Sequence, residues 1–227
     1  MQFNVRQREI TLKVVYYGPP LSGKTTNLRM LHQLLGAEQR GELTVFDTAD
    51  DRTLFFDLLP LQAQSESGYQ VKIKLYTVPG QVIHAATRRL VLAGADAVVF
   101  VADSRLVASR VNNEFWYGMR RFMTDNGIDP EHIPTVIQFN KRDLPGIRTD
   151  DELRIVGERG REPIFPAVAL RGDGVRDTFE ALLRLLHGDL ERRYHFSERF
   201  GISADELVAM VMPRATSGAR VAQEGVH

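Results

Sequence analysis

The sequence contains no cysteine among its 227 residues. This absence excludes a disulfide framework, a thiolate metal site and a palmitoyl or prenyl attachment. It also lacks an excess charge of either sign, since 29 basic residues balance 29 acidic ones, so no overall field attracts nucleic acid or an anionic membrane. No long apolar run is present, and Met1-Gln2 is not a myristoylation start. We therefore expect a cytoplasmic protein that binds no nucleic acid and has no direct membrane anchor.

Short apolar runs alternate with helical patterns along the chain. The runs are EITLKVVYY, TLFFDLLPL, YQVKIKLYTV, ADAVVFVAD, PTVIQFN and EPIFPAVA. Helical periodicity covers residues 25–35, 107–124 and 175–194, and in the last segment it places Val175, Phe179, Leu182, Leu186 and Leu190 on one face. Residues 54–76 carry two strand patterns with no helix between them, which is typical of an antiparallel hairpin. These patterns predict an α/β domain with a mostly parallel six-stranded sheet, one antiparallel hairpin and helices on both faces.

The domain is predicted to span residues 1–194, followed by a C-terminal extension at 195–213. Ser203 and Glu206 match a capping box there, and Ile202 and Leu207 are placed as its hydrophobic staple. The extension should therefore contain a short amphipathic helix, which needs a surface to dock on because it is too short to be stable alone. Residues 214–227 are small, polar and charged, and this composition predicts a disordered tail.

The stretch GPPLSGKTTN, at residues 18–27, fits the phosphate-loop pattern G-x-x-x-x-G-K-[ST] between a strand and a helix. In such a loop the backbone N–H groups wrap phosphate oxygens at a helix N-terminus. Gly18 allows the turn off the strand, Gly23 allows close backbone approach, and Lys24 reaches the β- and γ-phosphates. The Thr25 hydroxyl is a predicted Mg²⁺ ligand. The remaining predicted phosphate contacts are the backbone groups of Leu21, Ser22 and Thr26.

The stretch FNKRDL, at residues 139–144, contains N-K-x-D at the end of a strand. Asp143 can accept hydrogen bonds from N1–H and the 2-amino group of guanine, whereas adenine offers neither donor. Discrimination based on unpaired polar groups reaches about 10⁴. Lys141 can lay its methylene groups over the base, and Asn140 can tie this loop to the phosphate loop. The sequence thus predicts GTP and GDP as the ligands.

Two further stretches carry the expected response to a γ-phosphate. In YTVPGQ, the Gly80 N–H is placed to contact the γ-phosphate and Gln81 to orient the attacking water. In TADDRTLFFD, Thr53 offers a second hydroxyl to Mg²⁺.

The phosphate loop, DRTLFFD, LYTVPGQ and NKRDLP, in this order and spacing, resemble the bacterial mutual gliding protein A (MglA) family of Ras-like small GTPases over about residues 6–193. The resemblance implies a Ras-like P-loop GTPase fold and a switch that controls cell polarity or motility and is concentrated at a cell pole through partners. It implies that Arg52 acts in cis on the transferring phosphoryl group, with Gln81 aligning water. It also implies a homodimeric roadblock-fold (MglB-like) activator as partner. Thr77 replaces the aspartate that Ras-like proteins use near Mg²⁺, which implies weaker binding of Mg²⁺.

Two positions depart from the family pattern. Pro20 stands where glycine is usual, so one N–H is missing and the ring can crowd Gln81, which predicts slow hydrolysis. PAVALRG, at 166–172, stands where many Ras-like proteins have S-A-K. That motif contacts guanine O6 through a backbone N–H, here of Ala169 or Leu170, so the change of side chain costs little.

Three functions remain open on the sequence. The first is a GTPase switch that hydrolyses GTP slowly without its activator. The second is an interaction module that binds GTP and hardly hydrolyses it because of Pro20. The third is a metabolic P-loop kinase or ATPase, which N-K-R-D and the short connections disfavour.

Overall fold

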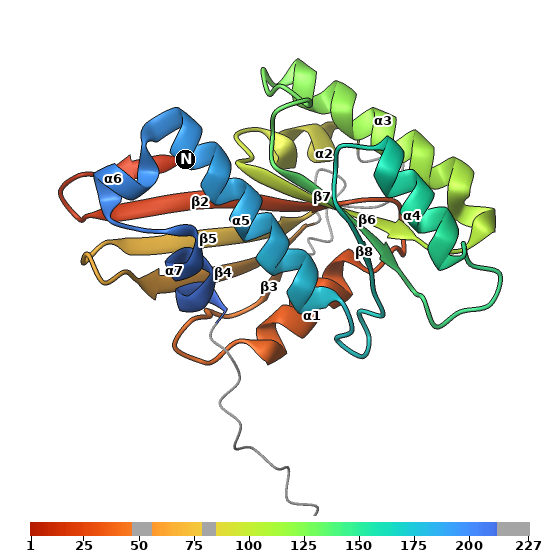
Figure 1. Cartoon of the computed structure of the whole chain (residues 1–227), viewed down its shortest axis with the longest axis horizontal. Helices are drawn as coiled ribbons and strands as arrows, with labels where there is room; N and C mark the ends of the chain where they lie inside the picture. Colours follow the sequence, from red (N-terminus) through yellow and green to blue (C-terminus); the bar gives the residue numbers. More distant parts are fainter. Residues whose placement is uncertain (47–55, 79–84, 213–227) are drawn as a thin grey trace, which may run out of the picture.

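A mixed β-sheet forms the centre of the molecule in the computed structural model, which describes residues 1–46, 56–78 and 85–212. The strands follow one another across the sheet in the order β3-β4-β5-β2-β6-β7-β8, and β1 pairs with β2 (Figure 1). Their bounds are β1 Gln2–Asn4, β2 Glu9–Tyr17, β3 Thr44–Phe46, β4 Phe56–Gln64, β5 Gln70–Thr77, β6 Ala97–Asp103, β7 Thr135–Asn140 and β8 Ile164–Pro166.

The α/β class and the mostly parallel sheet are confirmed, but the predicted strand count was too low. The six apolar runs form β2 and β4 to β8, and the two additional strands, β1 and β3, have three residues each. Three residues are too few to show the alternation by which a strand is recognised in sequence. The 54–76 hairpin is present as the antiparallel pair β4–β5, and β1–β2 and β3–β4 are antiparallel as well.

The helices lie on both faces of the sheet, as predicted. They are α1 Lys24–Leu34, α2 Ala85–Leu92, α3 Ser109–Asp125, α4 Asp150–Arg159, α5 Val175–Tyr194, α6 Phe196–Phe200 and α7 Ala204–Val211. The sequence patterns predicted α1, α3, α5 and α7 but not α2, α4 and α6. In α4, Thr149 and Glu152 form a complete capping box that starts the helix. Among the helices that the structure describes, none is long and apolar enough to cross a membrane.

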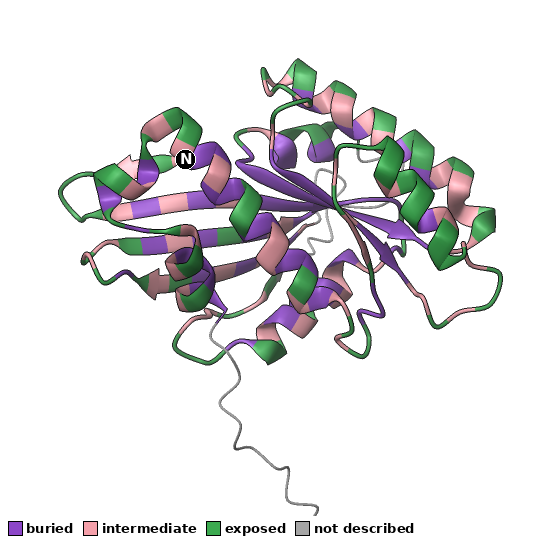
Figure 2. Ribbon diagram, viewed as in Figure 1, coloured by how far each residue is buried: buried purple, intermediate pink, exposed green. Residues whose placement is uncertain are grey.

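Two hydrophobic clusters fill the space between the sheet and its helices. Figure 2 shows that buried residues are concentrated on the central strands. The larger one joins α1, α5, α6 and α7 to one face, and the smaller one joins α2, α3 and α4 to the other. All five apolar residues predicted to share a face of α5 are at most 1% exposed. Removing a side chain such as that of Phe179 would cost about 3–5 kcal/mol of stability.

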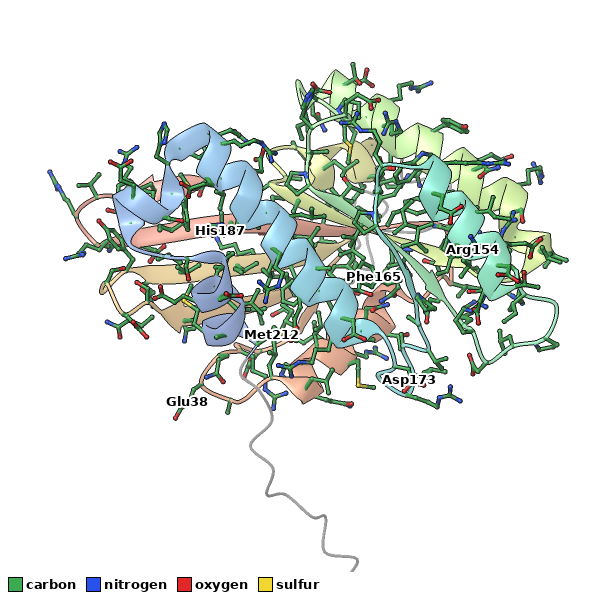
Figure 3. All side chains as sticks on the ribbon, in the orientation of Figure 1. Glu38, Arg154, Phe165, Asp173, His187 and Met212 are labelled. Carbon is green, nitrogen blue, oxygen red and sulfur yellow. The ribbon has the colours of Figure 1, made fainter. Side chains whose placement is uncertain are left out.

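The C-terminal extension packs on the domain itself. Leu207, Val208 and Val211 of α7 are buried against the cluster that contains α5, and Figure 3 shows His187 on α5 and Met212 at the end of α7. The Ser203 Oγ accepts the Glu206 N–H at 3.1 Å, so half of the predicted capping box is present. The Glu206 carboxylate accepts instead the N–H of Glu66, in the β4–β5 turn, at 2.9 Å. Here a tertiary contact has replaced the local one.

The topology places several loops at one edge of the sheet. Strands β5, β6 and β7 run parallel to β2 or to one another, so Thr77, Asp103, Asn140 and the phosphate loop after Tyr17 meet at their carboxyl ends. This edge is where ligands bind in open α/β sheets.

Candidate functional site

The phosphate loop connects β2 to α1, and its two glycines are required by space as well as conformation. A Cβ on Gly18, at φ 150°, would lie 2.2 Å from the Val101 carbonyl oxygen. A Cβ on Gly23, at φ 104°, would lie 2.2 Å from the Asn140 Nδ2. The loop can therefore pass this close to β6 and β7 only with glycine at both positions.

Lys24, at the start of α1, lies beneath the loop and is 7% exposed. Its Nζ donates to the carbonyl oxygens of Gly18, at 3.0 Å, and Pro19, at 2.7 Å. Burial lowers the pKa of Lys24 to about 7; the charge of Arg88 acts in the same direction, and that of Asp57 opposes it. Both bonds that Lys24 Nζ makes to the described residues are to backbone carbonyl oxygens, and a charged amine bonds phosphate oxygens more strongly than such neutral acceptors.

The rest of the loop presents backbone rather than side chains. Leu21 adopts the left-handed conformation at φ 58° and is 87% exposed, while the Ser22 side chain is buried. Such a local change of handedness turns successive N–H groups toward one point, where they can bind an anion. Pro20 is exposed, and Thr26 lies in the first turn of α1.

Thr25 is bonded to Asp57 of β4, which is bonded in turn to Thr77 of β5. Its Oγ1 donates to the Asp57 Oδ2 at 2.5 Å, and the same oxygen accepts the Thr77 Oγ1 at 2.9 Å. The Asp57 N–H donates to the Thr77 Oγ1 at 2.9 Å. Asp57 is therefore bonded to Thr77 through both its backbone and its side chain. Asp57 and Thr77 are 6% and 3% exposed. We call Lys24, Thr25, Asp57 and Thr77 the phosphate end of the site.

Asn140 joins the loop after β7 to the phosphate loop, as predicted, and also to the 166–172 loop, which was not predicted. Its Nδ2 donates to the Ser22 carbonyl oxygen at 2.8 Å, and its Oδ1 accepts the Ala169 N–H at 2.9 Å. Asn140 is 3% exposed, so these bonds are shielded from water. One buried amide thus fixes the phosphate loop, the N-K-R-D stretch and the 166–172 loop relative to each other.

Lys141 and Asp143 follow Asn140 on the open side of this junction. Lys141 adopts φ 67° and its Nζ donates to the Asp103 Oδ2 at 2.8 Å, while Asp143 is exposed. Among the described residues no acceptor bonds the N–H of Leu170, whereas the Ala169 N–H is engaged by Asn140. Of the two N–H groups that the sequence offered to guanine O6, the geometry favours that of Leu170. We call Asp103, Asn140, Lys141, Asp143, Ala169 and Leu170 the base end of the site.

Four predicted site residues lie outside the described residues: Arg52, Thr53, Gly80 and Gln81. Within residues 1–46, 56–78 and 85–212, no group of three or more His, Cys, Asp or Glu side chains could hold a metal ion. Among the described residues, the phosphate end offers the hydroxyls of Thr25 and Thr77 and the carboxylate of Asp57 to a metal ion.

The comparison with known proteins agrees with these motifs. No family model matches the chain. Over 189 residues the chain is 45% identical to the mutual gliding-motility protein MglA of Myxococcus xanthus. This alignment covers 83% of this chain and 97% of that protein. The chain belongs to the MglA family.

Asp57 lies at the phosphate end of this MglA-family chain, but the sequence motifs assign it no role. It lies inside the quoted stretch DRTLFFD, but a role was assigned only to Arg52 and Thr53. One sequence feature could have indicated a role for Asp57: it is an acidic residue within the apolar run TLFFDLLPL. A carboxylate in a central strand is rarely buried without a partner. Its partners could not be read locally, since Thr77 lies 20 residues further on and meets Asp57 only through the β4–β5 pairing.

Proposed function

We propose that this MglA-family chain binds GTP and GDP together with Mg²⁺, hydrolyses GTP to GDP and phosphate, and acts as a switch through partners of its GTP state. The observation that supports this most strongly is the buried Asn140 amide, which bonds Ser22 and Ala169 at once. A phosphate loop and a guanine-recognition stretch are thereby held at one edge of the sheet. Neither motif alone would distinguish a guanine site from other nucleotide sites.

At the base end, Asp143 is proposed to accept the N1–H and the 2-amino group of guanine. Its exposed carboxylate follows directly after Lys141 and Arg142, and the Arg142 N–H donates to the Ala167 carbonyl oxygen at 3.1 Å. This bond fixes the stretch against the 166–172 loop, where Leu170 offers its N–H to guanine O6. Donor and acceptor groups that match guanine therefore come from two loops bonded to each other.

The oxygen atoms at the phosphate end fit a magnesium ion. Mg²⁺ is usually bound in nucleotide sites by one or two protein oxygens together with phosphate oxygens and waters. Thr25 supplies a hydroxyl, and Asp57 supplies a carboxylate bonded to that hydroxyl. We propose that Asp57 takes the place of the carboxylate that Thr77 does not provide, and that Thr53 adds the second hydroxyl. When bound, the ion would neutralise charge on the β- and γ-phosphates.

Hydrolysis is proposed to depend on Arg52 and Gln81, with the Gly80 N–H contacting the γ-phosphate. These assignments rest on the sequence, because all three residues lie outside the described part of the chain. An arginine supplied in cis stabilises negative charge that develops during phosphoryl transfer, and a glutamine orients the attacking water. Pro20 lies in the phosphate loop, where its ring is proposed to crowd Gln81 and to slow the reaction.

The cellular role is proposed from the relative. The Myxococcus xanthus protein is named for mutual gliding motility. We propose that this chain likewise controls motility or cell polarity, and that a homodimeric roadblock-fold protein accelerates its GTP hydrolysis.

Bound-nucleotide chromatography and single-turnover GTP hydrolysis test the proposal on the full chain, with and without a roadblock-fold dimer. We expect guanine nucleotide to co-purify and the dimer to increase a slow basal rate. Retention of GTP with no hydrolysis in either condition would instead establish a binding module. Retention of adenine nucleotide would overturn the assignment of guanine and favour a P-loop kinase or ATPase.

A further inference from the structure

Asp103 is a nearly buried carboxylate at the base end, to which the motifs assign no role. It is the last residue of β6, lies opposite Asn140 in the β6–β7 pairing, and its side chain is 7% exposed. Its backbone is fixed by Asn112 of α3, which accepts the Asp103 N–H at 3.1 Å and donates to the Asp103 carbonyl oxygen at 2.9 Å. The position of this carboxylate is therefore set by the sheet and by α3.

Two cations share the Asp103 carboxylate. Lys141 Nζ donates to Oδ2 at 2.8 Å. Arg105 bonds both oxygens, with Nε at 3.0 Å from Oδ1 and Nη2 at 2.6 Å from Oδ2, and its backbone N–H donates to Oδ1 at 3.0 Å. Such a bidentate contact fixes the plane of a carboxylate. Arg105 therefore determines the position at which Asp103 can accept the hydrogen bond from the Lys141 ammonium.

Lys141 is held at both ends of its side chain. Its backbone is in the left-handed conformation, at φ 67°, which non-glycine residues rarely adopt, and its ammonium is bonded to Asp103. A free lysine side chain samples many rotamers, whereas this one has a fixed start and a fixed end. Ordering a side chain before a ligand arrives removes that entropy cost from binding.

We propose that Asp103 is a positioning residue for guanine-nucleotide retention, because it holds Lys141 in the conformation that covers the base, and that Arg105 holds Asp103 in turn. The inference rests on the proposed function, since it requires Lys141 to contact a bound guanine. Asp103 itself touches no nucleotide in this scheme. All of its influence on the ligand passes through Lys141.

A double-mutant cycle tests this dependence. Release of radiolabelled GDP into excess unlabelled GDP, with Mg²⁺ present, is followed for the full-length parent, Asp103→Asn, Lys141→Ala and the double variant. We expect each single substitution to accelerate release about tenfold and the double variant to release GDP no faster than Lys141→Ala. A double variant whose acceleration is the product of the two singles, about a hundredfold, would overturn the proposal. So would an Asp103→Asn variant that releases GDP at the parent rate.

Asp189 provides a matched control for the loss of a buried carboxylate. Its side chain is 8% exposed and accepts bonds from Arg192, at 3.2 Å, and Arg193, at 3.0 Å, on α5, away from the base end. Asp189→Asn should therefore leave GDP release at the parent rate. Equal acceleration in Asp189→Asn and Asp103→Asn would mean that general loosening, rather than Lys141, explains the effect.

The outcomes also separate this inference from the proposed function. A parent protein that binds no GDP contradicts the proposed function itself. A parent that binds GDP and is weakened by Lys141→Ala, but not by Asp103→Asn, contradicts only the role of Asp103. If Asp103→Asn does not fold, Arg105→Gln replaces it in the cycle. We then expect about threefold faster release that disappears in the Lys141→Ala background, and an unchanged rate would overturn the proposal.

Discussion

The base end and the phosphate end of the site differ in what their polar groups are bonded to. At the base end, the Asn140 amide bonds Ser22 and Ala169, and Lys141 bonds Asp103. None of these contacts uses Asp143 or the Leu170 N–H, the groups proposed to read guanine. The contacts that hold the base end together therefore leave its proposed guanine-reading groups available to a ligand.

At the phosphate end, the groups that a nucleotide would use are engaged by the protein. Lys24 Nζ bonds the carbonyl oxygens of Gly18 and Pro19, and the Thr25 hydroxyl bonds Asp57. In the proposed function, phosphate and Mg²⁺ would take over some of these contacts, so binding here would be an exchange of partners. The difference implies that changes at the base end alter how firmly a nucleotide is held. Changes at the phosphate end should alter the response to Mg²⁺ and to the γ-phosphate.

Loss of base recognition should give the largest effect. Asp143→Asn replaces the carboxylate oxygen that would accept the guanine 2-amino group by an NH₂ donor. We expect GTP to lose about 10³–10⁴-fold in preference over xanthosine triphosphate, whose 2-oxo group accepts a hydrogen bond from the new amide. Competition binding with the two nucleotides measures this change. Asp150→Asn is the control, because Asp150 is 90% exposed and bonds Arg142 of the same loop. Unchanged GTP affinity in Asp143→Asn would remove Asp143 from base recognition.

The rate of hydrolysis should respond next most strongly, and without a loss of affinity. Arg52→Ala should lower single-turnover hydrolysis about 10³-fold, or some 4 kcal/mol, because the arginine acts on charge present only in the transition state. Gln81→Leu should have a similar effect, and the double variant should be little slower than either single variant. Arg110→Ala is the control, since Arg110 is 82% exposed and pairs with Glu114 on α3. Hydrolysis by Arg52→Ala at the parent rate would mean that Arg52 has no catalytic role.

The motifs predicted those parts of the site that depend on local backbone geometry. Gly18 and Gly23 were identified by spacing, and the structure shows that a Cβ at either position would collide with β6 or β7 groups. The bond of Asn140 to the phosphate loop was also predicted, from its position within N-K-R-D. These features are encoded within a few neighbouring residues.

Contacts made through strand pairing were not predictable in the same way. The bond of Lys141 to Asp103 joins residues 38 apart, and that of Asp57 to Thr77 joins residues 20 apart. Both depend on which residues face each other across the sheet, and the apolar pattern of a single strand does not specify its partner. The choice between Ala169 and Leu170 likewise required the bond from Ala169 to Asn140. The roles of Arg52 and Gln81 remain predictions from sequence.

Substitution of Asp57 should reveal the metal dependence of the phosphate end. Asp57→Asn keeps the shape of the side chain but removes the negative charge beside Thr25, so we expect about tenfold more Mg²⁺ to be needed for half-maximal GDP retention, or about 1.4 kcal/mol. GDP retention in excess chelator should be unchanged. Thr77→Ser is the matched control because its hydroxyl can keep both bonds to Asp57. An Asp57→Asn protein with the parent Mg²⁺ requirement would show that the carboxylate is structural only.

Acid should remove part of the contribution of Asp103 to stability, and the part lost by pH 3.5 is the smallest of these effects. Burial alone raises the pKa of Asp103, but the hydrogen bonds from Arg105 and Lys141 outweigh it and lower the pKa from 3.8 to about 2. Because the folded pKa is the lower one, the stabilisation is fully present above about pH 4 and is lost as the pH falls from there toward 2. At pH 7, Asp103→Asn should reduce the free energy of unfolding by about 2 kcal/mol, the scale of a hydrogen bond to a charged group. Urea unfolding at pH 7, 5 and 3.5 should show a constant difference between parent and variant at the first two values and a smaller one at the last. A difference that stays the same at pH 3.5 would mean that Asp103 stabilises the base end through its shape and not through its charge.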